Sequence, residues 1–137
     1  MATKRKRSAD VREQVLAFAL GLPEAWEDHP WNESVAKVGK KVFVFFGSLD
    51  PDSPGISVKL IASHHEAMQL VGCQPTGYGL GKSGWVSLPM ASAPVDVICD
   101  FVEESYRNIA TKKLIAQIDV GATTAMDRQR ERGSRLG

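Results

Sequence analysis

The apolar residues of this chain recur with two periods, which predict long helices at both ends and β-strands between them. A first helix is predicted between a capping box formed by Asp10 and Glu13 and a break at Pro23. A last helix is predicted from Pro94 to about Asp119. The apolar stripes are Val11, Val15, Phe18, Ala19 and Leu22 in the first helix and Val95, Ile98, Val102 and Ile109 in the last.

The segment between these helices has the pattern of β-strands. Residues 34–38 and 41–46 flank Gly39-Lys40 and predict a β-hairpin. Its second arm is apolar on both faces, so we expect it at the centre of a sheet. Residues 56–60 alternate between apolar and polar side chains. This pattern directs Ile56, Val58 and Leu60 to the core and Ser57 and Lys59 to the opposite face of the sheet. The irregular stretch 24–31 has room for one edge strand.

A short helix and a second hairpin complete the predicted order. Ser63 and Glu66 form another capping box, which opens a helix over residues 64–72. Residues 76–80 and 85–88 then read as the two arms of a hairpin. The order is helix, three or four strands, helix, two strands, helix. It predicts an α+β fold in which the long helices cover one face of a single antiparallel sheet.

The glycine-rich run GYGLGKSGW at 77–85 resembles a phosphate-binding loop but does not fit one. Such a loop needs its first glycine five residues before the glycine of Gly-Lys-Ser, and Thr76 occupies that position. It also opens a helix whose first turn holds the phosphate, whereas an apolar strand-like segment follows here. The run is therefore predicted to be a hairpin turn with Lys82 at its tip and Trp85 in the returning strand.

Composition is that of a soluble globular protein, with 137 residues, 43% hydrophobic and 24% charged. No apolar run is long enough for a membrane span, and no signal peptide follows the basic N-terminus, so a cytoplasmic monomer without membrane contact is expected. Cys73 and Cys99 lack the spacing of a zinc site and are predicted to be buried free thiols.

Charge divides the chain into three parts. Residues 1–8 are predicted to be a disordered basic tail, because residues 1–7 carry four basic groups and no acid. Residues 9–120 are predicted to be the folded domain, and segment 8–120 has 9 basic and 14 acidic residues, a balance of −5. Residues 121–137 are predicted to be a flexible arginine-rich tail with a balance of 4 − 2 = +2. The folded part thus lacks the overall positive charge typical of nucleic-acid-binding domains.

Several segments, in the same order along the chain, resemble the MmcQ/YjbR family. They are LPEAWEDHPW at 22–31, VAKVGKKVFVFF at 35–46, SVKL at 57–60, GYGLGKSGWVSL at 77–88 and VEESYRNIATKK at 102–113. The resemblance implies an α-β3-α-β2-α order similar to the type III secretion chaperone fold. It also implies DNA binding through a double-wing motif. The two basic tails depart from the family core.

The two predicted hairpins are the candidate wings. Strand alternation directs Lys59 and Trp85 to the sheet face that the helices leave open. Lysines would neutralise phosphates, and aromatic side chains would stack on bases. The predicted nucleic-acid-binding residues are Lys37, Lys40, Lys41, Lys59, Tyr78, Lys82 and Trp85. Against this, hairpin lysines commonly protect sheet edges in solution, and Trp85 can equally fill a corner of the core.

The sequence leaves other functions open. The acidic domain and the chaperone-like fold favour a protein-interaction module, so DNA and another protein are both expected partners. A pocket near Trp26, Trp31 and Tyr106 would suit an enzyme, but no catalytic arrangement accompanies it. The pair His64-His65 lacks metal-site spacing. We therefore expect a non-enzymatic protein with no cofactor and no metal, and a solvated acidic face at Asp100, Glu103 and Glu104.

Overall fold

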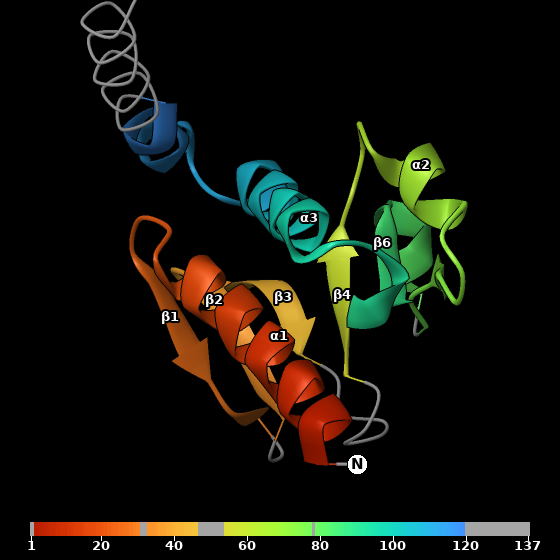
Figure 1. Cartoon of the computed structure of the whole chain (residues 1–137). Coiled ribbons are helices and arrows are strands. Elements are labelled where there is room, and N and C mark those ends of the chain that lie inside the picture. The colour runs from red at the N-terminus through yellow and green to blue at the C-terminus, as the bar shows by residue number, and fades with distance from the viewer. Residues whose placement is uncertain (1, 31–32, 47–53, 78, 120–137) are drawn as a thin grey trace, which may run out of the picture.

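The computed structural model describes residues 2–30, 33–46, 54–77 and 79–119 and has an α+β architecture (Figure 1). The helices are α1 (Ala2–Leu20), α2 (His64–Met68) and α3 (Val95–Ile109), with short 3-10 turns η2 (Leu80–Ser83) and η3 (Met90–Ser92). The strands are β1 (Ala25–Asp28), β2 (Ser34–Val38), β3 (Lys41–Phe46), β4 (Gly55–Lys59), β5 (Gln74–Pro75) and β6 (Trp85–Pro89). Within the described residues no helix has the length and apolar character needed to cross a membrane.

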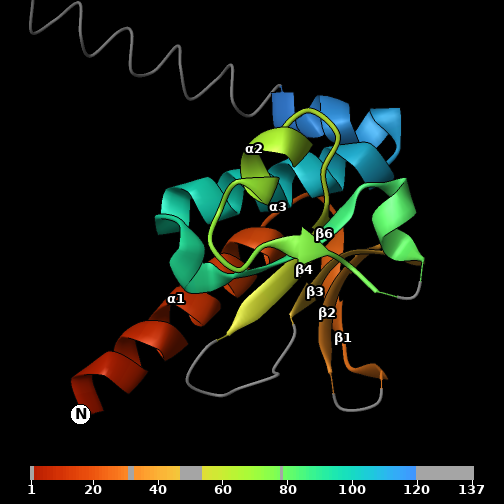
Figure 2. The same cartoon turned by 90° about the vertical axis from the view of Figure 1, so that its right-hand side faces the viewer.

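The strands form one antiparallel sheet in the order β1-β2-β3-β4-β6-β5. The predicted α+β fold with a single sheet is confirmed, and β3 lies at its centre as its two apolar faces indicated. The optional edge strand is present as β1, which gives four strands before α2 where the family resemblance implied three. Helices α1 and α3 pack side by side on one face (Figures 1 and 2).

Helix α1 begins at Ala2, eight residues before the predicted capping box. Residues 2–8, which lie in the tail predicted to be disordered, therefore have helical backbone. They contain no glycine or proline and are rich in Ala, Lys and Arg, which favour helices. The predicted end is confirmed, because Gly21 N–H donates to Ala17 O at 3.0 Å and the chain then turns into β1. The domain boundaries at residues 9 and 120 stay predictions, and the tail 121–137 lies outside the described residues.

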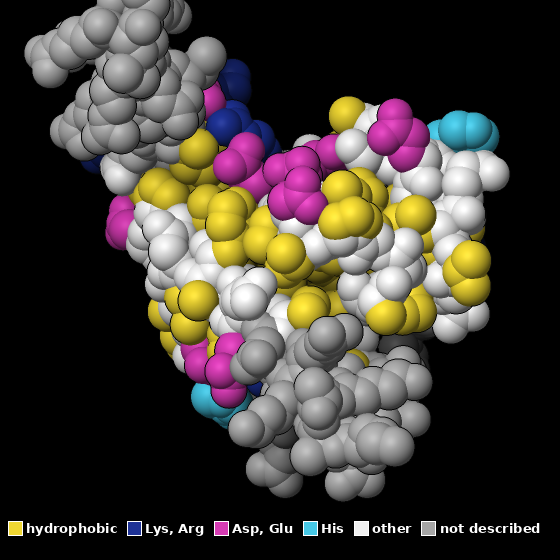
Figure 3. Space-filling model, viewed as in Figure 1, with side chains coloured by type: hydrophobic (Ala, Val, Ile, Leu, Met, Phe, Trp, Pro, Cys, Tyr) yellow, Lys and Arg dark blue, Asp and Glu magenta, His cyan; other side chains and the backbone are white. Residues whose placement is uncertain are grey.

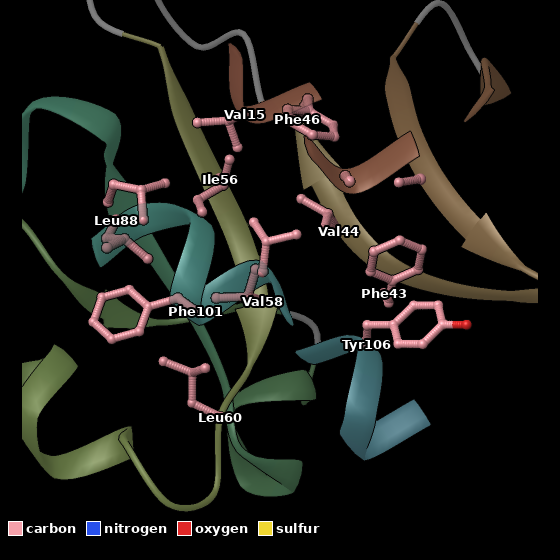
Figure 4. Packing of buried hydrophobic residues seen from close by; sticks show 14 of the residues in the cluster. Val15, Phe43, Val44, Phe46, Ile56, Val58, Leu60, Leu88, Phe101 and Tyr106 are labelled. Carbon is pink, nitrogen blue, oxygen red and sulfur yellow. The ribbon is translucent and has the colours of Figure 1, made fainter. Parts of the chain in front are cut away.

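The core lies between the helices and the sheet (Figure 4). The predicted alternation of β4 is confirmed, with Ile56, Val58 and Leu60 buried. Strand β3 carries a bulge, because Ala36 pairs with Val44 whereas the next residue, Lys37, pairs with Val42. The extra residue is Phe43, whose ring meets Tyr106 of α3 edge-on at 5.2 Å. Phe43 and Val44 therefore both join the core, which strict alternation does not predict.

Two side chains of α3 complete the hydrogen bonding of the sheet where β3 and β4 separate, and a third bonds to the turn before β1. The Ser105 hydroxyl donates to Phe43 O at 2.6 Å and accepts from Lys59 N–H at 2.8 Å. Asn108 Nδ2 donates to Lys59 O at 2.9 Å. Tyr106 donates to Pro23 O at 2.6 Å and so fixes the turn between α1 and β1. The last helix is thus an integral part of the sheet's bonding pattern.

Helix α3 ends at Ile109, ten residues before its predicted end. Ala110 is extended, and helical backbone resumes over 112–119 behind Thr111, whose hydroxyl accepts from Leu114 N–H at 3.4 Å. A local cap at Thr111 therefore divides the predicted helix in two.

The predicted capping box at α2 is absent, since Ser63 makes no side-chain cap bond and the helix ends at Met68. Glu104 of α3 takes that role, accepting from the N–H groups of Ile61 and Ser63 at 2.9 and 3.1 Å. Partial burial alone would raise its pKa, but hydrogen bonds from Ser63 and from the backbone of residues 61–63 hold the pKa of Glu104 below its usual value. The sequence suggested that Glu104 belongs to a solvated acidic face, but this side chain is hydrogen-bonded to the segment before α2.

Candidate nucleic-acid interface

The strand directions bring the candidate lysines to one end of the sheet. Strand β3 begins, β4 ends and β6 begins at this end, because neighbouring strands run antiparallel. Val44 of β3 pairs with Val58 of β4, and Lys59 of β4 pairs with Trp85 of β6. We call it the lysine end and define it by four residues, Lys40, Lys41, Lys59 and Lys82. Three of these are exposed, and Lys59 is half-buried. The β2–β3 turn and the β5–β6 connection, the two candidate wings, both lie here.

Lys37 lies on the open sheet face but is already paired. Its Nζ is 2.7 Å from Asp28 Oδ2 on the neighbouring strand and 5.2 Å from the centre of the Trp26 ring. Hydrogen bonding to Lys37 lowers the pKa of Asp28, so this carboxylate is charged at neutral pH. The Trp26 ring in turn donates from Nε1 to Gly39 O at 2.9 Å and is 44% exposed. The positive charge of Lys37 is therefore largely neutralised.

Trp85 points to the open face, as alternation predicted, but it is only 7% exposed. Phe45, its neighbour across the sheet, meets it edge-on with ring centres 5.3 Å apart. Such a ring cannot act as a free stacking surface for a base. Tyr78, the other aromatic candidate, lies outside the described residues, as does Trp31.

The glycine-rich run is a compact connection between β5 and β6, and its arms pair antiparallel as predicted. The first arm lies at 74–75, earlier than the predicted 76–80, because the turn η2 occupies residues 80–83. Loop amides are used internally: Gly81 N–H donates to Thr76 O at 3.0 Å and Gly84 N–H to Gly81 O at 3.2 Å. A phosphate-binding loop needs such amides free, and β6 follows in place of a helix, which excludes that motif here.

Gly84 has a structural function in this connection. Its φ of +97° lies in the region that favours glycine, and a Cβ added there would approach Leu60 O at 2.7 Å. Leu60 N–H donates to Gly84 O at 3.0 Å, so the loop is held directly against the end of β4. Gly84 therefore permits the close contact between this wing and the end of β4.

Hydroxyl groups line the open face beside Phe45. Ser57 and Ser87, paired across β4 and β6, have Oγ atoms 2.7 Å apart, and Thr76 Oγ1 is 2.9 Å from Ser87 Oγ. The chain of hydroxyls gives this face a polar, uncharged strip between the apolar rings and the edge strand β5. The strip adds hydrogen-bonding groups next to the lysine end.

The other candidate sites gain no geometric support. Within the described segments no group of three His, Cys, Asp or Glu side chains is arranged to hold a metal. Tyr106, proposed to line a pocket, is fully buried. Cys73 and Cys99 are free and half-buried, a less complete burial than predicted. Burial raises the pKa of both thiols, which disfavours the reactive thiolate.

Sequence reasoning missed one feature that shapes this surface. It is Asp28, whose pairing with Lys37 follows from the β1–β2 register and is visible only once β1 is recognised as a strand.

Comparison with known proteins identifies the fold. A family model described as YjbR matches residues 20–108. A crystal structure of the Deinococcus radiodurans protein DR2400, described as a DUF419 domain, is similar with a TM-score of 0.59 and 19% sequence identity. The alignment covers 74% of this chain and 79% of that one. No curated protein matches the sequence.

Proposed function

The chain belongs to the YjbR family, and we propose that it is a non-enzymatic, monomeric, cytoplasmic protein that binds DNA through the lysine end of its sheet. The observation that carries the proposal is the convergence of Lys40, Lys41, Lys59 and Lys82 from three strand ends. The basic segments at the two chain termini supply further positive charge.

The spacing of these lysines suits a phosphate backbone. Strands β3 and β6 are two positions apart in the sheet, so they lie about 10 Å apart where Val44 pairs with Val58 and Val58 with Val86, and further apart beyond these pairs, where β3 and β4 separate. One DNA strand carries a charge every ~3.4 Å along the helix axis, so the ends of these strands span at least about three phosphates. Flexible lysine stems on two turns can follow such a row. Lys37 is omitted from the proposed contacts because Asp28 neutralises it.

The proposed contacts are with the backbone of the DNA and not with its bases. Trp85 is buried against Phe45, and lysine contacts to phosphate carry no sequence information. We therefore expect binding with little sequence preference. Four phosphate contacts give a log–log salt slope of about −3.6 on a duplex, so affinity falls roughly a hundred-fold between about 50 and 200 mM salt.

Fluorescence anisotropy with a labelled duplex tests this proposal. Lys40→Glu/Lys82→Glu places two acidic groups at the lysine end and is expected to weaken binding more than ten-fold at low salt. The control is Lys112→Glu/Lys113→Glu, which makes the same change in net charge on the helical segment after α3. Equal weakening by both variants would assign the effect to net charge. No binding by the full chain at low salt would reject DNA binding altogether.

A second candidate is a protein-interaction module, and exposed apolar side chains favour it. Ile61 and Val71, on either side of α2, are 67% and 87% exposed. Figure 3 also shows hydrophobic side chains spread across the face of α1 and α3. A protein partner that binds the full chain, and stays bound after nuclease treatment, would support this function. Loss of that binding in Ile61→Ser/Val71→Ser, with DNA binding intact, would separate the two.

A further inference from the structure

We propose that Trp26 is a stacking site for an unpaired base, which makes single-stranded DNA a ligand of this surface. Trp26 lies on β1, and the sequence suggested other aromatic residues, Tyr78 and Trp85, for this role. The inference rests on the DNA binding proposed above and adds to it the kind of strand that is bound. The lysines contact the backbone, and Trp26 adds one contact with a base.

Trp26 borders the lysine end. The β1–β2 and β2–β3 registers place the start of β1 beside the start of β3, at this end of the sheet. The indole Nε1 of Trp26 donates to Gly39 O at 2.9 Å, so the ring is attached to the β2–β3 turn. The next two residues, Lys40 and Lys41, are exposed. The aromatic ring and the two positive charges therefore share one turn.

Two contacts hold the Trp26 ring in a defined orientation. One is the hydrogen bond to Gly39 O, and the other is Lys37 on the neighbouring strand, whose Nζ lies 5.2 Å from the ring centre. Lys37 covers one face of the ring, yet 44% of the residue is exposed. The exposed area therefore lies mainly on the other face. A ring that is already held in place loses little conformational freedom when a ligand packs on it.

Trp26 also differs from the other large aromatic side chains in its exposure. Among the Phe, Tyr and Trp residues that the structure describes, it alone is exposed. Trp85 and Phe45 pack edge-on against each other, and Tyr106 is fully buried in the core. Stacking with a base needs one open face, which Trp26 provides.

The partner of this ring is an unpaired base. In a duplex each base is stacked and paired, and taking it out of the stack costs free energy that a single strand does not require. Stacking on an aromatic side chain tolerates all bases, because every base has a π-face. The phosphates next to a base on Trp26 lie beside the turn that carries Lys40 and Lys41. The ring thus adds affinity for single strands without adding sequence preference.

A strand without bases separates stacking from charge. Fluorescence anisotropy of the full chain is measured at low salt with labelled oligothymidylate, with an abasic strand of equal length and with a duplex. The two single strands carry the same phosphates, so the electrostatic contribution largely cancels in the ratio of their affinities. The wild-type protein is expected to bind oligothymidylate at least about five-fold more tightly than the abasic strand. Equal affinities would overturn stacking and leave backbone binding intact, and no binding to any of the three would reject DNA binding itself.

Two variants, Trp26→Leu and Trp26→Phe, assign the effect to the ring. Both lose the hydrogen bond from Nε1 to Gly39 O, but only phenylalanine keeps an aromatic face. Trp26→Leu is expected to abolish the difference between oligothymidylate and the abasic strand, and Trp26→Phe to keep most of it. Neither is expected to change the affinity for the duplex. Each ratio is taken within one protein, so a general loss of stability does not alter it.

Two results with these variants would contradict the role of Trp26. A preference for oligothymidylate that persists in Trp26→Leu would place the base contact elsewhere. An equal loss of the preference in both variants would show that Trp26 acts only by holding the β2–β3 turn.

Discussion

Replacing Ser105 with alanine is expected to destabilise the fold far more than its size suggests. The hydroxyl is fully buried and bridges Phe43 O and Lys59 N–H where β3 and β4 separate. Alanine leaves both backbone groups buried without a partner, at about 1–3 kcal/mol each. A combined loss of about 3 kcal/mol is a large part of a typical stability of 5–15 kcal/mol, and would lower the melting temperature by about 10 °C.

Urea unfolding followed by circular dichroism measures this loss, with Ser57→Ala as the control. Ser57 makes its hydroxyl contact with Ser87 on the open face, so its removal is expected to cost less than about 1 kcal/mol. The midpoint should shift with little change in the denaturant slope, because the same surface is exposed on unfolding. Equal losses for the two variants would refute the bridging role of Ser105.

Two further substitutions test the contacts around β4. Gly84→Ala is expected to lower the free energy of unfolding by more than about 1 kcal/mol, because the φ of Gly84 is +97° and the new Cβ would clash with Leu60 O. Thermal or urea unfolding measures this loss. Gly77→Ala is the neutral control, since Gly77 has open space around it and no positive φ. Glu104→Gln is expected to reduce the stability of the fold at neutral pH. The pKa of Glu104 is lower in the folded protein than in the unfolded chain, so the charged carboxylate stabilises the fold above the ordinary carboxyl pKa. This stabilisation disappears as the pH falls through the pKa of the folded state. Unfolding curves of wild type and Glu104→Gln should therefore converge in acid, and a difference that persists there would contradict this reading.

The periodic part of the fold was predictable from the sequence because burial of one face leaves a regular pattern. The stripes of α1 and α3 and the alternation of β4 are confirmed. The bulge at Phe43 was not predictable, because an apolar run on β3 fits either register until its partners are known. The cap of α2 was missed for a similar reason: Glu104 is distant in sequence and competes successfully with the local Glu66.

The candidate interface was predictable in composition and less so in geometry. Strand order brings Lys40, Lys41 and Lys82 to one end, as two adjacent hairpins suggested. The exposure of each side chain depends on partners across the sheet, such as Asp28 for Lys37 and Phe45 for Trp85. Those partners come from other strands, so local pattern alone cannot identify them.

The salt dependence of duplex binding tests the proposed interface most directly. It is measured for the wild-type protein and for Lys40→Gln/Lys41→Gln/Lys82→Gln at several salt concentrations. If these lysines contact phosphates, the slope of log affinity against log salt becomes shallower by about 0.9 for each, or about 2.7 in total. A slope that is unchanged in the variant would place the DNA contacts elsewhere and contradict the proposed role of the lysine end.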